Sequence, residues 1–129
     1  MAGIIGIGGV FFKAPDPAAT CDWYGRVLGI EFGEWGGAVF LPATAAAHPG
    51  AATVFAPFAA DTEYFAPSAE PFMINLMVDD LDAVLVRCGE HGVGPLGAIL
   101  DEANGRFAHV LDCDGRKVEL WEPRPMAPA

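Results

Sequence analysis

The chain has 129 residues, 53% of them apolar, and a formal net charge of −10 from 17 acidic and 7 basic residues. This length and apolar content predict one folded domain with a core, and they exclude a largely disordered chain. So few Lys and Arg residues disfavour nucleic-acid binding, because contacts to phosphates need clustered positive charge. No apolar run nears the roughly 20 residues that span a bilayer. The first residues do not resemble a signal peptide, so we expect a cytoplasmic protein without a membrane partner.

The two halves of the sequence share one pattern. Each half contains an apolar run, an acidic helix start, a short amphipathic stretch and a glycine stop; the segments are GIGGVFFKAPDPAATCDWYGRVLGI and FMINLMVDDLDAVLVRCGEHGV. Asp16 corresponds to Asp80, and Gly29 corresponds to Gly92. A repeat of about half the chain indicates two copies of one supersecondary unit, with a cleft built by their pairing.

The first half predicts the element order β-α-β-β-β. Residues 4–13 are apolar and β-prone, and they predict a strand. Asp16 and Pro17 provide an N-cap and a first-turn proline for a helix, and Gly29 ends it. Three shorter strands are predicted at 30–35, 38–41 and 53–58.

The second half predicts the same order. Residues 72–78 form the expected strand, Asp80 caps a helix that Gly92 stops, and a weak strand is expected near 96–100. A hairpin of residues 107–111 and 117–122 is predicted around the turn sequence Asp114-Gly115. The expected single domain, 1–129, then consists of module one at about 3–60, a linker at about 61–71 and module two at about 72–124.

Three segments, taken in order, resemble the vicinal oxygen chelate superfamily, the group of glyoxalase I, bleomycin-resistance proteins and extradiol dioxygenases. They are WYGRVLGI after the first helix start, VDDLDAV at the second, and GRFAHVLDCDGRKVELWEP near the end. The resemblance covers residues 3–124 and implies an α+β fold in which two βαβββ modules form an open, cupped, mixed sheet. It also implies that modules pair across subunits, which predicts a homodimer.

The metal enzymes of this superfamily take one ligand from the first strand and one from the last strand of each module. The resemblance places these four positions at Gly9, at Phe55 or a neighbour of it, at Met73 and at Glu119. Only Glu119 has a side chain that ligates metals, and one carboxylate does not hold a catalytic transition metal. We therefore expect no metal and no other cofactor.

Strand periodicity makes Glu119 a candidate site residue. Side chains alternate between the two faces of a sheet, so Glu119 and Trp121 share one face and Val118 and Leu120 share the other. If the latter pack on the helices, Glu119 faces the cup as a base or cation ligand; the alternative is an inherited ligand position paired with an Arg or a backbone donor. His109 is the one histidine in a predicted strand, and it is either an acid–base or ligand residue or a hydrogen-bonded residue of a half-buried sheet.

The residues expected to line the cup are aromatic or apolar apart from the polar pair just described: Trp35, Phe55, Met73 and Trp121. Together with the resemblance, they predict a metal-independent, glyoxalase-like protein that binds a small, partly apolar organic molecule, as bleomycin-resistance proteins do by sequestration. One alternative is a glyoxalase-like lyase or isomerase with Glu119 as general base, and another is an interaction domain without a ligand. The sequence leaves open whether a reaction is catalysed and whether the cup forms within one chain.

Overall fold

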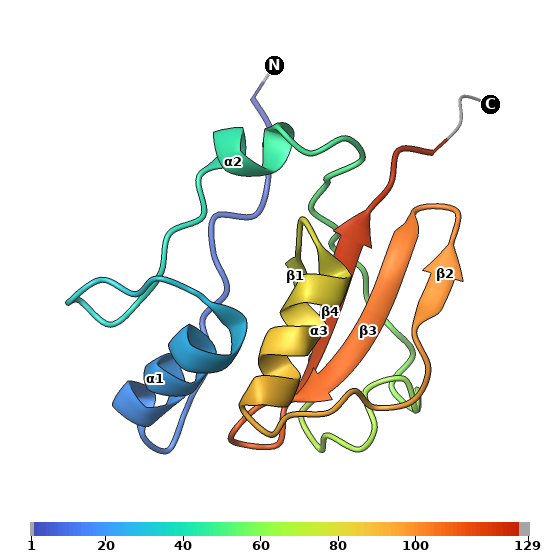
Figure 1. Cartoon of the computed structure of the whole chain (residues 1–129). Coiled ribbons are helices and arrows are strands. Elements are labelled where there is room, and N and C mark those ends of the chain that lie inside the picture. Colours follow the sequence, from blue (N-terminus) through green and yellow to red (C-terminus); the bar gives the residue numbers. More distant parts are fainter. Residues whose placement is uncertain (1, 127–129) are drawn as a thin grey trace.

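The protein, described here from a computed structural model over residues 2–126, contains an open four-stranded mixed sheet with helices on one face (Figure 1). Met1 and residues 127–129 of the expected domain lie outside the described residues. In the sheet, β1 is parallel to β4, and the other neighbours are antiparallel. The strands, in their order across the sheet, are β1 (Ile74–Met77), β4 (Lys117–Pro123), β3 (Gly105–Leu111) and β2 (Leu100–Glu102).

The predicted hairpin of the second half is confirmed as the centre of the sheet. Gly115 in its turn has φ 81°, a left-handed conformation that glycine adopts without strain. The register places His109 of β3 opposite Glu119 of β4. The weak strand that the sequence predicted near 96–100 is present a few residues later, as β2 at Leu100–Glu102.

Both predicted main helices are present, and both begin as the repeat indicates. In α1 (Pro17–Leu28), Asp16 accepts a hydrogen bond from the backbone N–H of Ala19, and in α3 (Leu81–Glu90), Asp80 accepts one from Ala83. The short helix α2 (Pro42–Ala46) lies where the sequence predicted a loop; a first-turn proline and alanines favour it. No helix within residues 2–126 is long and apolar enough to cross a membrane.

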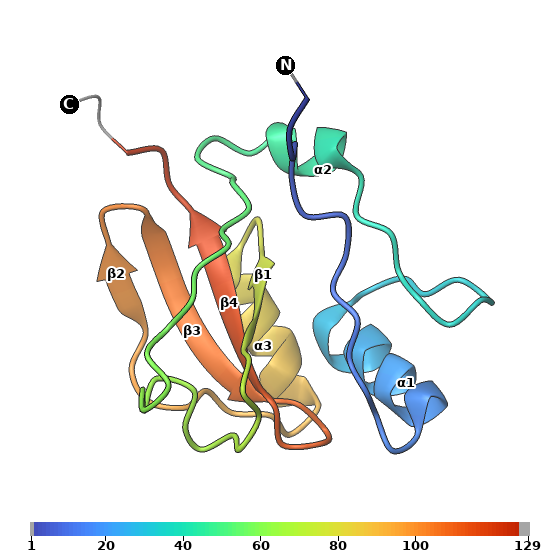
Figure 2. The same ribbon diagram turned by 180° about the vertical axis from the view of Figure 1, so that it is seen from behind.

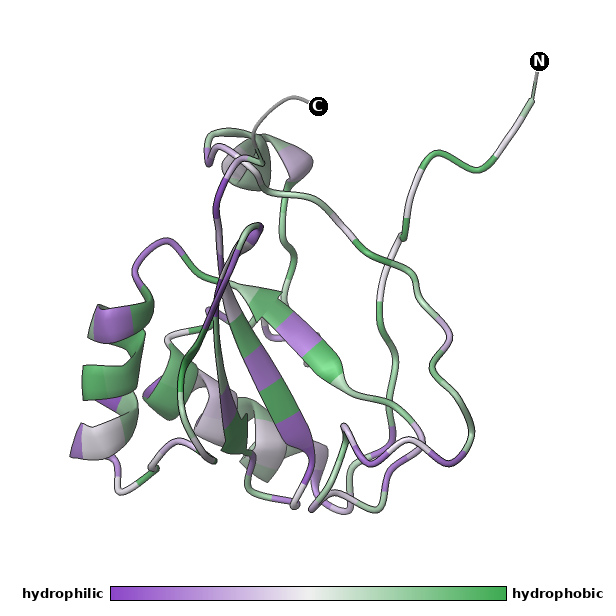
Figure 3. Ribbon diagram, turned by 90° about the vertical axis from the view of Figure 1, so that its right-hand side faces the viewer, coloured by the Kyte–Doolittle hydropathy of each residue, from purple (hydrophilic) through white to green (hydrophobic). Residues whose placement is uncertain are grey.

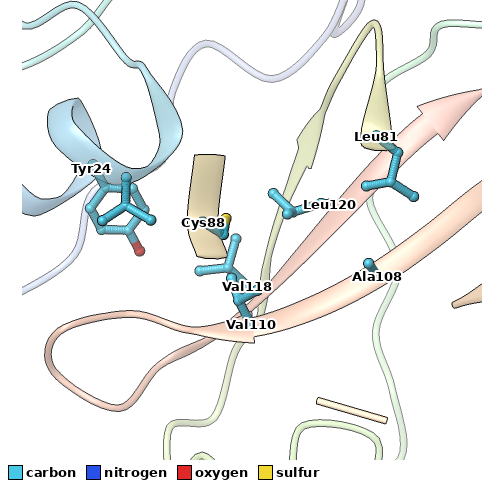
Figure 4. Close-up of a cluster of buried hydrophobic side chains, with 8 residues drawn as sticks. Tyr24, Leu81, Cys88, Ala108, Val110, Val118 and Leu120 are labelled. Atoms are coloured by element: carbon cyan, nitrogen blue, oxygen red, sulfur yellow. The ribbon is translucent and has the colours of Figure 1, made fainter. Parts of the chain in front are cut away.

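The hydrophobic core lies between the sheet and the helices α1 and α3 (Figure 4). Val118 and Leu120 of β4 point into it and are almost fully buried. The alternation of hydrophilic and hydrophobic residues along the strands is visible in Figure 3. The opposite face of the sheet, called here the concave face, therefore carries the other side chains of β3 and β4. The core cluster consists of Tyr24, Val27, Leu81, Cys88, Ala108, Val110, Val118 and Leu120.

The strand predictions for the first half are wrong for the single chain. Residues 4–13, 30–35, 38–41 and 53–58 are neither helix nor strand in the structure, and every described strand follows residue 73. The segments at 4–13, 30–35 and 38–41 lie beside the sheet, whereas 53–58 passes across its concave face (Figures 1 and 2). A strand forms only with a hydrogen-bonded neighbour, and these segments have none within the described chain. The βαβββ order is therefore present in the second half alone, as β1-α3-β2-β3-β4.

The first-half segments leave many large apolar side chains exposed to solvent. Phe11 is 96% exposed and Phe55 is 88% exposed. Such exposure is unusual in a monomeric domain and indicates surface that a further contact would cover. The other large, exposed apolar side chains of these segments are Ile4, Ile5, Ile7, Val10, Phe12, Trp35, Val39, Phe40, Leu41, Val54 and Phe58.

Candidate binding site

A polar cluster lies on the concave face of the sheet, built from three adjacent strand positions and one residue of the linker. Asn75 of β1, Glu119 of β4 and His109 of β3 lie side by side in the strand register. Asn75 Nδ2 donates to Glu119 Oε1 at 2.7 Å, and His109 Nε2 lies 2.7 Å from Glu119 Oε2. Glu119 and His109 are 7% and 5% exposed, so this is a buried polar centre.

The linker contributes Tyr64 to this centre. The Tyr64 hydroxyl donates to Glu119 Oε2 at 2.5 Å and lies 3.2 Å from His109 Nε2. Burial, together with the hydrogen bond to Glu119, raises the pKa of the Tyr64 phenol above its usual value. The phenol therefore stays protonated and acts as a donor throughout the physiological pH range.

Two aromatic rings and one lysine also contact the ring of Tyr64. It stacks on Phe58 with ring centroids 5.8 Å apart, and it meets the His109 ring edge-on at 5.5 Å. Lys117 Nζ lies 4.9 Å from the centroid of the ring and donates to the backbone carbonyl of Tyr64 at 2.6 Å. Such a cation over an aromatic face is attractive.

An open cavity of about 1410 Å³ adjoins this cluster, between the concave face and the segment 52–75. Glu119 and Asn75 provide polar groups in its lining. Phe107 and Trp121 form one apolar wall as parallel rings 5.9 Å apart. Trp121 Nε1 donates to the carbonyl of Asn104 at 3.0 Å, which fixes the indole in place. The remaining large apolar lining residues include Phe58, Phe65, Phe72 and Met73.

The structure brings some of the predicted site residues together and leaves two apart. Glu119, Trp121 and Met73 line the cavity, and His109 contacts Glu119 from beneath it. Trp35 is 72% exposed and does not line this cavity; its ring lies against the backbone of the Gly33–Gly37 turn. Phe55 does not line it either, since its side chain points to solvent while its neighbours border the cavity.

Sequence reasoning missed Tyr64. The available signal was a lone tyrosine, one of two in the chain, within a linker otherwise composed mainly of Ala, Pro and acidic residues. Its role depends on a contact to a strand 55 residues later, which no local pattern encodes.

The metal-ligating residue types do not gather in the described part of the chain. Within residues 2–126, no group of three or more His, Cys, Asp and Glu side chains is arranged to hold a metal ion. In the polar cluster on the concave face, Glu119 and His109 are the two residues whose side chains commonly ligate metals. They form a hydrogen bond with each other.

The fold is shared with solved structures. TioX from Micromonospora sp. ML1 matches with a TM-score of 0.51 at 18% identity, over 89% of this chain and 94% of that one. VPC_CASS1, from the mobile metagenome of V. Pseudocholerae, matches with a TM-score of 0.51 at 18% identity, over 93% and 98%. TnmS3, described as an antibiotic binding protein from Streptomyces sp. CB03234, is 33% identical over 42% of this chain and 45% of that one, with a TM-score of 0.38.

No protein-family model matches the chain, and no curated protein matches it. The whole-chain likenesses support the bleomycin-resistance and glyoxalase type of fold, and at this identity they show the fold alone.

Proposed function

We propose that the protein binds a small, partly apolar organic molecule in the cavity on the concave face and sequesters it. The observation that carries this proposal is the lining of the cavity, in which aromatic side chains such as Phe107 and Trp121 lie beside the buried carboxylate of Glu119. Pockets that bind small organic molecules combine these features, with apolar contact for affinity and few polar groups for orientation.

The hydrogen bonding of Glu119 favours binding over the alternative of a lyase or isomerase. A general base needs a free oxygen within reach of the substrate proton. Both oxygens of Glu119 already accept hydrogen bonds, from Asn75 on one side and from Tyr64 and His109 on the other. These hydrogen bonds occupy three of the four acceptor sites of the carboxylate, which leaves little of it available for a substrate proton.

A screen of drug-sized organic compounds by isothermal titration tests this function. Met73 lines the cavity, so Met73→Asp places a charge against the apolar part of a ligand and should weaken any hit at least about tenfold. Val86→Asp is the matched control, since Val86 is 62% exposed on α3 outside the cavity and the charge change is the same. Hits that bind both variants equally would contradict the proposed site.

We further propose that the protein is a homodimer in which a second copy covers the apolar first-half segments. Two observations support it: the exposed apolar residues of these segments, and β1, an edge strand with free hydrogen-bonding groups on one side within the described sheet. Light scattering should give twice the 13.5 kDa chain mass at micromolar concentration. Phe40→Asp should shift the mass toward that of one chain, whereas Val86→Asp should not; a monomeric wild type would refute the proposal.

A further inference from the structure

The Tyr64 hydroxyl contacts Glu119 and His109, and Glu119 is the buried carboxylate in the lining of the cavity. We infer that Glu119 and His109 form a receptor for an aromatic hydroxyl, that Tyr64 fills this receptor in the free protein, and that the bound molecule is a phenol that takes its place. This inference rests on the proposed function, since it names the chemical class of the ligand for the same cavity.

The contacts around Tyr64 define what the receptor accepts. An acceptor, Glu119 Oε2, lies 2.5 Å from the phenol oxygen, and a ring nitrogen of His109 lies 3.2 Å from it. The ring itself has a stacking partner in Phe58 and a cation over its face in Lys117. A hydroxyl on an electron-rich aromatic ring satisfies all of these groups at once.

Burial restricts the choice of ligand further. A ligand that displaces Tyr64 without bringing a donor leaves Glu119 Oε2 with His109 as its remaining partner, and the loss of a hydrogen bond to a buried carboxylate is unfavourable. Hydrocarbons and ethers of the same size are therefore rejected. A site built to hydrogen-bond a hydroxyl discriminates against analogues that lack it far better than an apolar pocket discriminates by size.

The position of Tyr64 makes the exchange accessible. The segment 61–71 that carries it has no helix or strand, and Tyr64 is 36% exposed. Glu119 borders the open cavity while contacting Tyr64, so a ligand in the cavity reaches the same carboxylate. Apart from its ring and hydroxyl contacts, Tyr64 is held by the Lys117 bond to its carbonyl and by Thr62 Oγ1, which accepts from its N–H at 3.2 Å.

The test uses 4-methylphenol, which has the structure of the tyrosine side chain, and 4-methylanisole, which lacks the hydroxyl proton. Tyr64→Ala removes the side chain that occupies the receptor, so this variant should bind 4-methylphenol at least about tenfold more tightly than the wild type does. The same variant should also bind 4-methylphenol at least about tenfold more tightly than 4-methylanisole. Adding Glu119→Gln to Tyr64→Ala should remove most of this preference. Val86→Ala, at an exposed apolar position of α3 outside the cavity, is the control and should bind 4-methylphenol as the wild type does.

If Tyr64→Ala does not fold, as judged by circular dichroism, Tyr64→Phe replaces it. This variant keeps the ring and removes the hydroxyl, so displacement costs fewer hydrogen bonds and 4-methylphenol should again bind more tightly than to the wild type. Equal binding of both probes, weakened by Met73→Asp, would overturn the hydroxyl receptor and leave the proposed function standing. Failure of Tyr64→Ala and Tyr64→Phe to bind 4-methylphenol would overturn the hydroxyl receptor, whereas the proposed function is decided by the compound screen.

Discussion

The Tyr24 hydroxyl donates a 2.6 Å hydrogen bond to Asp112 Oδ2, and this contact joins helix α1 to the end of strand β3. Asp112 is buried and also accepts from Arg116 Nη1 at 2.9 Å. Arg116 in turn donates to the carbonyl of Lys13, so one buried cluster fixes the start of the chain to the hairpin turn. Burial, followed by the contact with Asp112, raises the pKa of Tyr24, which keeps this phenol a donor.

Tyr24→Phe should therefore destabilise the protein by about 1–3 kcal/mol, because it leaves a buried carboxylate with one hydrogen-bond donor fewer. Urea denaturation followed by circular dichroism measures the change. The ring still fills its place in the core, so the slope of the transition should not change. A midpoint equal to that of the wild type would show that Arg116 alone satisfies Asp112 Oδ2.

Leu120→Ala should cost about 2–5 kcal/mol through loss of buried apolar surface and the cavity left behind. Leu120 is 1% exposed beneath the helices, on the face of β4 opposite the cavity, so ligand affinity of the folded variant should stay within about twofold of the wild type. Val86→Ala, at an exposed helix position, is the control and should cost less than about 1 kcal/mol. Ligand loss without loss of stability would contradict the assigned faces of β4.

Local signals in the sequence were sufficient for the helices and the hairpin. Asp16 and Asp80 cap their helices as predicted, and the Asp114-Gly115 turn joins β3 to β4. Alternation along β4 also assigns Glu119 to the concave face, since Val118 packs in the core. These features depend on residues within a few positions of one another, so the sequence contains what determines them.

The lack of strands in the first half and the Tyr64 contact could not be predicted in the same way. The residues at 4–13 have strand propensity, but a strand also needs a hydrogen-bonded neighbour, and the described chain provides none for them. Tyr64 comes from a segment without periodicity and reaches a strand distant in the sequence. Trp35 is a large aromatic residue of the kind that often lines binding pockets. Its side chain lies against the glycine-rich turn at 33–37 and does not reach the cavity.

Glu119→Gln should cost about 1–3 kcal/mol of stability, because a buried carboxylate with three partners becomes an amide that cannot accept on both sides. This is more than the substitution would cost in an open cleft. Denaturation midpoints of this variant and of Glu34→Gln, at an exposed position, give the comparison. An unchanged midpoint for Glu119→Gln would show that the hydrogen bonds of the cluster add no net stability.

Asp114 in the hairpin turn should contribute stability that depends on pH. Hydrogen bonds from Thr20 and then from Arg116, at 2.9 Å and 3.0 Å, hold the pKa of its carboxyl below the usual value. A folded-state pKa below the unfolded one means that the contribution is present above the unfolded value of about 4 and is lost as the pH falls through the folded value. Asp114→Asn should thus lower the urea midpoint at pH 7, and the gap to the wild type should narrow toward pH 3. Asp61→Asn, at an exposed linker position, is the control. If the difference in urea midpoint between Asp114→Asn and the wild type stays constant from pH 7 to pH 3, the charge of Asp114 is not what stabilises the turn.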